Sequence, residues 1–456
     1  MADTPVIEIG DTHWEGDPKE EEKRRDPVVS LFRPRARVDL TPYINSFPIS
    51  THFRLLRIVP SMSRQSQFSL PCCTVLVSVS GASPGGILRH INQSGVFMKS
   101  RIAGALLTFV LAAVALTTAQ TYTITDIGAL KGDNESSGFW INNLGEVVGC
   151  SDTQTSEGYP CTGLVSGQHA FSWTKSGGMK DLGTLSGATV SGAIGVNDAG
   201  TVVGYSNVKG QLATNFVAIQ WSSTGSITNL GTLSGGSSSA AFQINSAGEI
   251  TGDSFLSSGV VSATSWTSKK IKNLGALPKA IFTAGLGIND NSYIAGESVF
   301  GYGPPFTSHG FLWNGSTMKD LGTLPGGVTS LANAINAAGV VVGQSDGAST
   351  KGNWHAVMWN TSEKIQDLGV LPGGTYSIAF AINDSSVVVG YGNLFNNAAH
   401  AMIWTSSGGM QDLNSLIPAN SGWVLINANA INNVGQITGY GTKGGHNHAF
   451  LLTPVN

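Results

Sequence analysis

Histidines and aspartates are the side chains of this 456-residue chain that could take part in acid–base chemistry, and they recur at fixed places in a repeated pattern. In five copies of an aromatic segment a histidine lies four residues before a tryptophan or, in the last copy, before Leu452. The first residue of the Asp-Leu-Gly type of segment, which we expect to lie beside it, is an aspartate in the same five copies. The expected pairs are His169 with Asp181, His309 with Asp320, His355 with Asp367, His400 with Asp412, and His448 with Asp126. Two further copies carry Val217 and Ser262 in place of histidine, and they carry Asn229 and Asn273 in place of aspartate.

This covariation between repeats predicts a hydrogen bond between each imidazole and the aspartate on the neighbouring strand. A carboxylate in that position serves catalysis only where a nucleophile stands at the same place, and five copies of one active site are not expected in one chain. We therefore predict a structural function for the five pairs, with metal binding or catalysis as the alternative. The sequence has no phosphate-binding loop, His-Glu-x-x-His, Gly-x-Ser-x-Gly or EF-hand pattern, so we expect neither a metal nor a cofactor.

Two carboxylates form a second candidate site. Asp253 and Glu297 follow the glycine of a strand-like segment at equivalent points of two successive copies. A pair of carboxyl groups hydrolyses glycosidic bonds when the two are suitably separated. A carbohydrate-active hydrolase is therefore one alternative function. Because only two of seven equivalent positions are acidic, this signal is weak, and we favour a protein that is not an enzyme.

The elements that would position these residues follow from a repeat of 44 to 55 residues. Each copy contains a turn of the type Ile-Asn-x-x-Gly, and its asparagine is Asn142, Asn197, Asn245, Asn289, Asn336, Asn383 or Asn432. Each copy also holds four short strand-like runs, for example 330–336, 340–345, 309–313 and 317–324, joined by turns rich in Asn, Asp and Gly. Four strands in a repeat of this length predict one blade of a β-propeller.

The ends of the repeat region predict how the propeller closes. The run 121–130 resembles the fourth strand of a copy, but no first three strands precede it. The last run of the repeat region resembles the third strand, and no fourth strand follows it. Pairing these two runs completes the last blade and removes the exposed sheet edges. We therefore predict an all-β, seven-bladed β-propeller of four-stranded blades, closed by the N-terminal strand pairing with the C-terminal strand. The first strand of each copy is rich in Ser, Ala and Gly, which suits the crowded position next to the axis.

Residues 98–119 have the three parts of a secretory signal peptide. Lys99 and Arg101 precede the uncharged run 102–116, and small residues follow at 117–119. That run is shorter than the roughly 20 residues of a membrane span. We therefore expect translation to begin at Met98, with 1–97 a spurious or disordered extension and 120–456 the propeller; a signal anchor is the alternative. Secretion into an extracellular or periplasmic space follows, with no membrane span in the mature chain.

Three segments recur in a constant order: the His-Ala-Phe-Leu-Trp type, the Asp-Leu-Gly-Thr-Leu-x-Gly-Gly type, and the Ile-Asn-x-x-Gly-x-Val-Val-Gly type. Over about 121–456 the chain closely resembles the bacterial HAF-repeat family of predicted extracellular proteins. The resemblance implies secretion and a propeller-like repeat fold, and it implies no established activity. The copies Asn215–Trp221 and Val261–Trp266 depart from the family pattern, because the histidine that gives the family its name is missing there.

The loops between the second and third strands vary most between copies, and we expect them to share one face with the links between blades. Their aromatic residues are Tyr159, Phe300, Tyr302, Phe306, Trp354 and Phe395. Exposed aromatic rings near polar groups suit a sugar or protein surface, whereas ordinary loop packing is the alternative. Charged residues make up 12% of the chain and the net charge is −3, so we expect no nucleic-acid partner.

Cys150 and Cys161 bracket the first of these loops. An oxidising compartment predicts a disulfide between them, with free thiols as the alternative. Closing so short a loop would stabilise the fold by about 2–3 kcal/mol. From the sequence we expect a monomeric, secreted binding module for an extracellular polysaccharide or protein surface. The alternatives are a hydrolase that uses Asp253 and Glu297, and a structural envelope or matrix protein.

Overall fold

The computed structural model describes residues 120–152, 161, 167–209, 215–268, 270–301 and 306–455. Four predictions fall outside these ranges: the extension 1–97, the signal peptide 98–119, and the binding residues Tyr159 and Tyr302. Within them the chain is all β, with strands β1 to β28 and one short 3-10 helix, η1 (Leu413–Ser415). No helix in these ranges is long and apolar enough to cross a membrane.

Five sheets have four strands each. The first contains β2 (Glu135–Ile141), β3 (Val147–Asp152), β4 (His169–Thr174) and β5 (Gly178–Asp181). The second contains β6 (Ser191–Val196), β7 (Val202–Asn207), β8 (Phe216–Trp221) and β9 (Ile227–Asn229). The third contains β18 (Ser330–Ile335), β19 (Val341–Ser345), β20 (His355–Trp359) and β21 (Ile365–Asp367). The fourth contains β22 (Ser377–Ile382), β23 (Val388–Asn393), β24 (Ala399–Thr405) and β25 (Gly409–Asp412). The fifth contains β26 (Trp423–Ile431), β27 (Ile437–Lys443), β28 (His446–Pro454) and β1 (Tyr122–Gly128).

The remaining eight strands form one sheet. Its first half is β10 (Ser239–Ile244), β11 (Ile250–Phe255), β12 (Val261–Thr267) and β13 (Lys270–Gly275). Its second half is β14 (Phe282–Ile288), β15 (Ile294–Gly301), β16 (Thr307–Trp313) and β17 (Met318–Asp320). Within each half the strands pair antiparallel in chain order, and a single parallel pair, Val261 with Phe282, joins the halves. The prediction of a propeller with four-stranded blades is confirmed. The predicted number of seven is not found: five four-stranded sheets are separate, because this pair joins the other eight strands into a single sheet.

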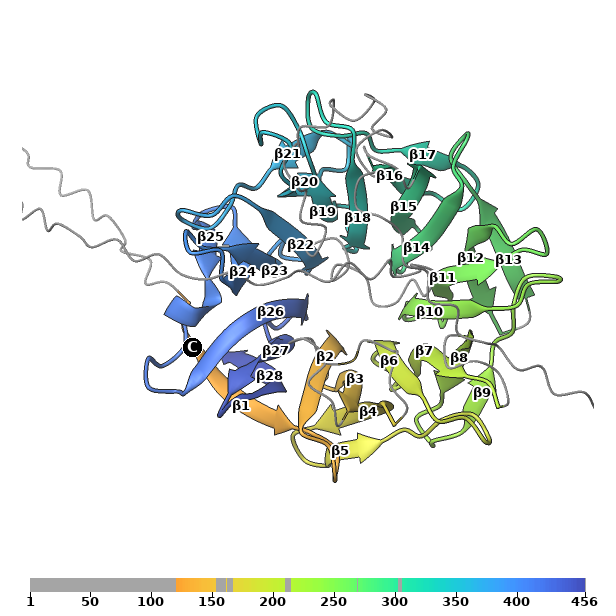
Figure 1. Cartoon of the computed structure of the whole chain (residues 1–456), viewed down its shortest axis with the longest axis horizontal. Coiled ribbons are helices and arrows are strands. Elements are labelled where there is room, and N and C mark those ends of the chain that lie inside the picture. The colour runs from red at the N-terminus through yellow and green to blue at the C-terminus, as the bar shows by residue number, and fades with distance from the viewer. Residues whose placement is uncertain are drawn as a thin grey trace, which may run out of the picture. The chain divides into compact units, whose positions relative to one another are not determined.

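Figure 1 shows the sheets arranged around a central axis, with β2, β6, β10, β14, β18, β22 and β26 innermost. Small residues on these inner strands allow the strands to approach each other closely. On β6, a Cβ added to Gly195 would lie 2.8 Å from the carbonyl oxygen of Phe242 on β10. The richness of the first strand in Ser, Ala and Gly is therefore a consequence of crowding at the axis.

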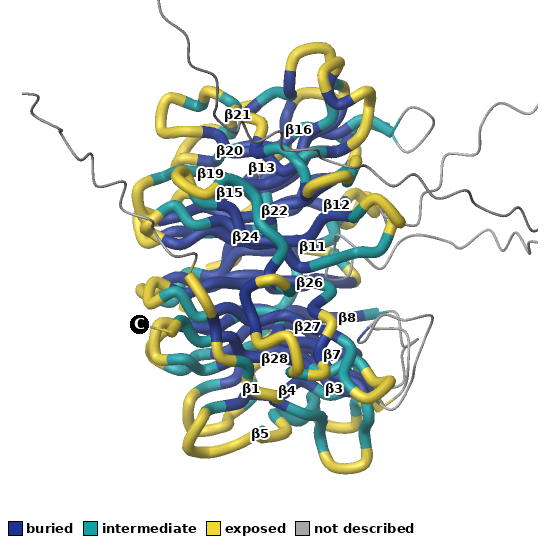
Figure 2. Tube along the Cα trace, turned by 90° about the vertical axis from the view of Figure 1, so that its left-hand side faces the viewer, coloured by how far each residue is buried: buried dark blue, intermediate teal, exposed yellow. Residues whose placement is uncertain are grey.

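The hydrophobic core lies between neighbouring sheets. Trp221 of β8, for example, belongs to one buried cluster with Val148 of β3 and Ala193 of β6. All six repeated tryptophans are buried: Trp173, Trp221, Trp266, Trp313, Trp359 and Trp404. Trp359 also donates from Nε1 to the carbonyl oxygen of Leu321, in the link from the preceding sheet, at 2.9 Å. Figure 2 shows the buried strands in the middle of the side view and the exposed connections at their ends.

Seven asparagines join the sheets at one end of the strands. In each turn the side-chain Nδ2 donates to the backbone oxygen of the equivalent asparagine in the next copy, at 3.0 to 3.2 Å. In each turn the Oδ1 accepts from the backbone N–H four residues later in the chain. The last link runs from Asn432 back to Asn142, so the seven asparagines form a closed ring.

The first strand pairs with the last strand, as predicted. β1 runs antiparallel to β28, with Tyr122 opposite Pro454 and Gly128 opposite Ala449. The backbone N–H of Val455 also donates to the carbonyl oxygen of Thr121 at 2.9 Å. The fourth strand of this sheet therefore comes from the opposite end of the repeat region.

Candidate functional site

Two kinds of connection share one face of the propeller. We call this the loop face; it consists of the connections from the second to the third strand of each sheet and the links from one sheet to the next. The Ala348 N–H, in the β19–β20 loop, donates to the carbonyl oxygen of Pro325, in the link before β18, at 2.9 Å. The turns that carry the asparagine ring lie at the other ends of the strands, and we call that end the turn face.

One residue of each of four loops packs against the same part of its sheet, although its type differs from loop to loop. Lys209, Ser257, Ala348 and Phe395 each lie against a glycine of the link that enters the same sheet, namely Gly187, Gly235, Gly326 and Gly373. These glycines have φ between 74° and 80°, a left-handed conformation that residues with a Cβ rarely adopt. The scaffold is therefore constant at this position, and the side chain that it presents differs from sheet to sheet.

The structure brings together all five His–Asp pairs. The Nδ1–Oδ distances are 2.9 Å for His169–Asp181, 2.8 Å for His309–Asp320, 3.0 Å for His355–Asp367, 2.6 Å for His400–Asp412 and 3.0 Å for His448–Asp126. Each histidine is among the first three residues of the third strand and each aspartate is among the last three of the fourth, so the pairs lie at the outer rim of the loop face. Among the described residues no group of three or more His, Cys, Asp or Glu side chains could hold a metal ion.

Each of these aspartates also closes its own turn. In four pairs one carboxylate oxygen accepts from the glycine N–H two residues later, and in the fifth Asp412 accepts from the N–H of Asn414. The asparagines of the copies without histidine keep this bond: Asn229 accepts from Gly231 and Asn273 from Gly275, both at 2.8 Å. The residue at this position therefore forms the turn in all seven copies, and in five of them it also bonds to a histidine.

The hydrogen bonds change the acidity of these carboxyls. Burial raises the pKa of Asp320 and of Asp367, but the bonds from the paired histidine and from the glycine N–H lower it by more. The net pKa of both groups therefore lies below the usual 3.8. The pKa of Asp126 is lowered in the same way, with Lys443 as an additional donor at 3.0 Å.

A cluster at the junction of the chain ends was missed by the sequence reasoning. Glu135 of β2 is buried; it accepts from the backbone N–H of Asn447 at 2.9 Å and lies 3.4 Å from Nδ1 of His446. The rings of His446 and His448 are stacked, with centroids 6.4 Å apart. The only sequence signal was His446, an additional histidine two residues before His448 that no other copy has.

The two candidate catalytic carboxyls are buried. Asp253 lies opposite Ala240 and is 7% exposed, and Glu297 lies opposite Ala284 and is 3% exposed. Burial raises the pKa of Asp253 to about 7 and that of Glu297 to about 8. The Oε2 of Glu297 has no hydrogen-bond partner among the described residues. Acids placed in this way do not reach a polysaccharide at the surface, so the geometry gives the hydrolase alternative no support.

The loop aromatics do not form one exposed set. Phe395 is 91% exposed at the tip of the β23–β24 loop. Trp354 is only 7% exposed, and Phe300 and Phe306 pack against separate hydrophobic clusters. Phe300 meets the ring of His309 edge to face, with centroids 5.3 Å apart. For Trp354 the expectation of an exposed binding residue is wrong, because the folded loop places its ring inside the protein.

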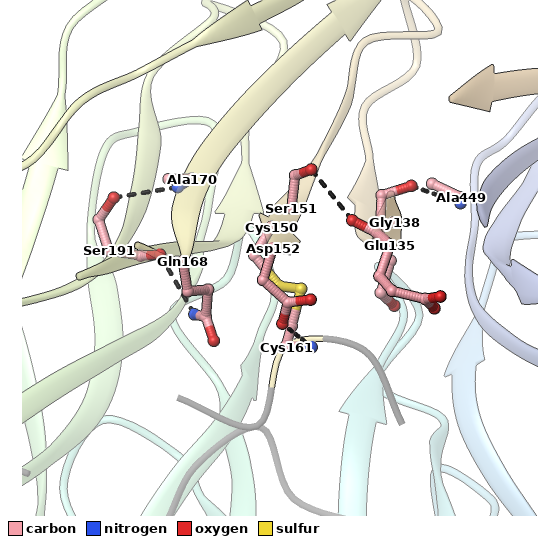
Figure 3. Close-up of a disulfide and its surroundings, with 12 residues drawn as sticks. Glu135, Gly138, Cys150, Ser151, Asp152, Cys161, Gln168, Ala170, Ser191 and Ala449 are labelled. Atoms are coloured by element: carbon pink, nitrogen blue, oxygen red, sulfur yellow. Dashed lines mark hydrogen bonds between the residues drawn. A yellow bond between two sulfur atoms is a disulfide. The ribbon is translucent and has the colours of Figure 1, made fainter. Parts of the chain in front are cut away.

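The predicted disulfide between Cys150 and Cys161 is present, with the two Cα atoms 6.0 Å apart. Figure 3 shows Cys150 on β3 and Asp152 beside the bond. A carboxylate oxygen of Asp152 accepts from the backbone N–H of Cys161 at 2.9 Å. The disulfide and this hydrogen bond together attach the loop to the strand from which it leaves.

No protein-family model and no curated protein matches the chain. Among solved structures, a puromycin-hydrolysing peptidase from Mycobacterium tuberculosis is 11% identical with a TM-score of 0.45, over 67% of this chain and 49% of that one. TolB from Acinetobacter baumannii is 11% identical with a TM-score of 0.35, over 64% and 77%. The lectin of Aleuria aurantia is 12% identical with a TM-score of 0.32, over 58% and 93%. This chain spans about half the length of the peptidase, and similarity at this level transfers neither activity nor ligand to it.

Proposed function

We propose that this chain is a secreted, monomeric propeller of the HAF-repeat type that binds an extracellular polysaccharide or protein surface through its loop face. One observation carries the proposal: at a single repeated packing position the loops present Lys209, Ser257, Ala348 and the exposed Phe395. A scaffold that repeats while its surface side chains differ is the arrangement by which loops on a rigid framework acquire binding function.

We further propose that the propeller has seven blades. The two halves of the eight-stranded sheet share only the pair Val261–Phe282 and otherwise have the strand order of the four-stranded sheets, so we count each half as a blade. The asparagine ring supports this count because it has seven members and one link per copy. On this view β1 completes the last blade beside β28 and closes the ring without a free sheet edge.

The proposed function is tested by incubating the full chain with a panel of insoluble polysaccharides and measuring depletion of protein and release of reducing sugar. We expect depletion without new reducing ends. Phe395→Ala should weaken the binding, because an exposed aromatic ring can stack on a sugar ring. Leu144→Ala is the matched control, since Leu144 is 77% exposed but lies on the turn face.

The outcomes separate the three functions. New reducing ends that disappear in Glu297→Gln would establish the hydrolase instead. Absence of binding to every polysaccharide and to extracellular proteins of the source organism would contradict the binding function and leave a structural one. Equal losses in the Phe395 and Leu144 variants would place the binding surface elsewhere than on the loop face.

A further inference from the structure

Two histidines lie on one face of β28, beside the junction of the chain ends. His446 and His448 are two residues apart in this strand, and side chains with that spacing project from the same face of a sheet. Their rings are nearly parallel, with an interplanar angle of 17° and centroids 6.4 Å apart. The side chain of His446 is 47% exposed and that of His448 is 23% exposed. A dissolved ion can therefore reach both rings.

A carboxylate contacts the same nitrogen of each ring. Nδ1 of His448 lies 3.0 Å from Oδ1 of Asp126 on β1, and Nδ1 of His446 lies 3.4 Å from Oε1 of Glu135 on β2. An ionised carboxylate only accepts hydrogen bonds, so Nδ1 of the neutral imidazole carries the proton and Nε2 keeps its lone pair. Within the part of the chain that the structure describes, no hydrogen bond engages either Nε2. Histidines that bind metal ions through Nε2 are held by a carboxylate in this way.

The second histidine and the buried carboxylate both depart from the repeat. Two positions before the other rim histidines the chain has Gly167, Thr307, Asn353 and Ala398. Glu135 precedes Ser136, and the residues before the equivalent serines of four other copies are Val190, Ser238, Thr329 and Tyr376. Glu135 is only 1% exposed, and burying a charge is costly unless it is paired. These two departures lie in contact with each other, which indicates that they serve one purpose.

Three charged groups contact the two rings or each other at this junction. Asp126 and Glu135 contact the rings, and Nζ of Lys443 donates to the second carboxylate oxygen of Asp126 at 3.0 Å. Two carboxylates and one ammonium leave an excess of one negative charge while both imidazoles are neutral. The charges next to the two rings therefore favour a cation, and Lys443 reduces this effect.

The two nitrogen donors determine the class of ion. Neutral imidazole nitrogen is a ligand for Zn²⁺, Cu²⁺ and Ni²⁺, and affinity among the divalent ions of the first transition row is generally highest for Cu²⁺. Two nitrogens bound to one ion at about 2.0–2.1 Å each lie no more than about 4 Å apart. Two protein donors leave the other coordination positions to water.

We propose that His446 and His448 chelate a divalent transition-metal ion through their Nε2 atoms, with Cu²⁺ bound most tightly, while carboxylates orient the rings. Rotation of the exposed His446 side chain, whose contact with Glu135 is long, brings its Nε2 within chelating distance of the other. A chelate of two histidines on one strand is smaller than the groups of three or more ligands that the described residues lack. The site goes beyond the proposed function, because it needs neither a polysaccharide nor a partner protein.

Calorimetric titration of the full chain, without a histidine tag, with Cu²⁺ tests the site. His446→Gln and His448→Gln should each bind Cu²⁺ about ten-fold more weakly or worse, since loss of even an outer-shell partner weakens metal affinity by about 10–100-fold. The matched control is His309→Gln, which removes a histidine paired with Asp320 at 2.8 Å but without a second histidine beside it. It should bind as the parent does. Every variant keeps the histidines of residues 1–119, so the differences between variants report on the junction.

Two further variants distinguish metal binding from damage to the fold. Glu135→Gln keeps an acceptor for the N–H of Asn447 but loses the charge that holds Nδ1 of His446, so Cu²⁺ should bind about ten-fold more weakly. Lys443→Gln should bind Cu²⁺ more tightly, because it removes a positive charge beside the site. Cu²⁺ should raise the unfolding temperature of the parent and of Lys443→Gln, and it should raise that of the histidine variants less.

Three results would overturn the inference. The first is equal Cu²⁺ affinity in the parent and in both variants at His446 and His448. The second is an equal loss in His309→Gln, because single rim histidines would then account for the binding. The third is weaker Cu²⁺ binding in Lys443→Gln than in the parent, because a cation at the junction must be repelled by that ammonium group.

Discussion

The side-chain Nδ2 of Asn432 donates a hydrogen bond to the backbone oxygen of Asn142 at 3.0 Å, across 290 residues of chain. This bond is the last link of the asparagine ring, and it joins the final copy of the repeat to the first. In the same turn the Oδ1 of Asn432 accepts from the N–H of Gln436 at 2.8 Å. One amide group therefore shapes a local turn and connects two ends of the repeat region.

Asn432→Ala should destabilise the protein, because it removes these two bonds and a third, which Nδ2 donates to Oε1 of Gln436 at 2.9 Å. It also leaves the buried Asn142 oxygen without this donor. We expect a loss of about 2–3 kcal/mol in the free energy of unfolding, measured by urea denaturation. Asn291→Ala is the control, since Asn291 is exposed and forms only a long side-chain bond of 3.4 Å to Ala337. A loss in the Asn432 variant no larger than in this control would show that the ring contributes nothing to stability.

Variants of the His309–Asp320 pair distinguish the stability that comes from the turn from the stability that comes from the bond to histidine. Asp320→Ala removes the bonds to both His309 and Gly322, so it should destabilise the protein more than His309→Ala, which removes only one. Asp320→Asn should recover most of the loss, because Asn229 and Asn273 form the same turn without histidine. Thermal unfolding of the three variants at neutral pH tests this order. Equal destabilisation by Asn and Ala at 320 would contradict it.

The lowered pKa of Asp320 also predicts a dependence of stability on pH. A carboxyl whose folded pKa lies below its unfolded value stabilises the native state above the unfolded pKa, and this contribution is lost as pH falls through the folded pKa. Unfolding of the parent should therefore become easier as pH falls below about 4. Asp320→Asn should reduce this acid sensitivity, and an unchanged pH profile in the variant would contradict the assignment.

The raised pKa of Glu297 predicts the opposite dependence of stability on pH. Burial raises its pKa to about 8, so the native state holds a proton that the unfolded chain releases near pH 4.5. Its contribution is favourable below pH 4.5 and is lost progressively as pH rises to about 8. Glu297→Gln should be more stable than the parent at pH 9 by a few kcal/mol, on the order expected for a shift of this size, and nearly equal to it at pH 4.

Urea denaturation at the two pH values measures this difference. The control is Glu249→Gln, since Glu249 lies in a turn-face connection and is only partly buried. A Glu297→Gln variant that loses stability at pH 9 would mean that the carboxylate is bound and charged in the native protein. A variant that keeps its stability but loses the ability to release reducing sugar would revive the hydrolase alternative.

Reduction of the Cys150–Cys161 disulfide should cost about 2–3 kcal/mol in the free energy of unfolding, because the bond limits the unfolded chain. The measurement is urea denaturation with and without a thiol reductant. The double variant Cys150→Ser with Cys161→Ser should resemble the reduced parent and should not respond to reductant. A response of this variant would show that the reductant acts elsewhere.

Much of the fold could be predicted because its signals are local and repeat. Asn142 and its equivalents mark hairpin turns, the tryptophans mark a buried strand, and the pairing of His448 with Asp126 already placed β1 beside β28. The candidate site was less predictable. Trp354 stands in a variable loop and reads as a surface aromatic, but the folded loop turns it inward; Phe395, in a loop of similar composition, remains exposed.

The four-stranded unit, its constant turns and the partners of its histidines could be predicted from the sequence, because they depend on residues close along the chain or on comparison between copies. Features that depend on neighbouring sheets required the folded protein. It determined that Asp253 and Glu297 lie between sheets and are buried, and that Asn432 meets Asn142. It also determined that Lys279 adopts a left-handed backbone, with a φ of 72°, that favours glycine. Burial and backbone strain depend on atoms that are distant in sequence, and no short segment of the chain contains them.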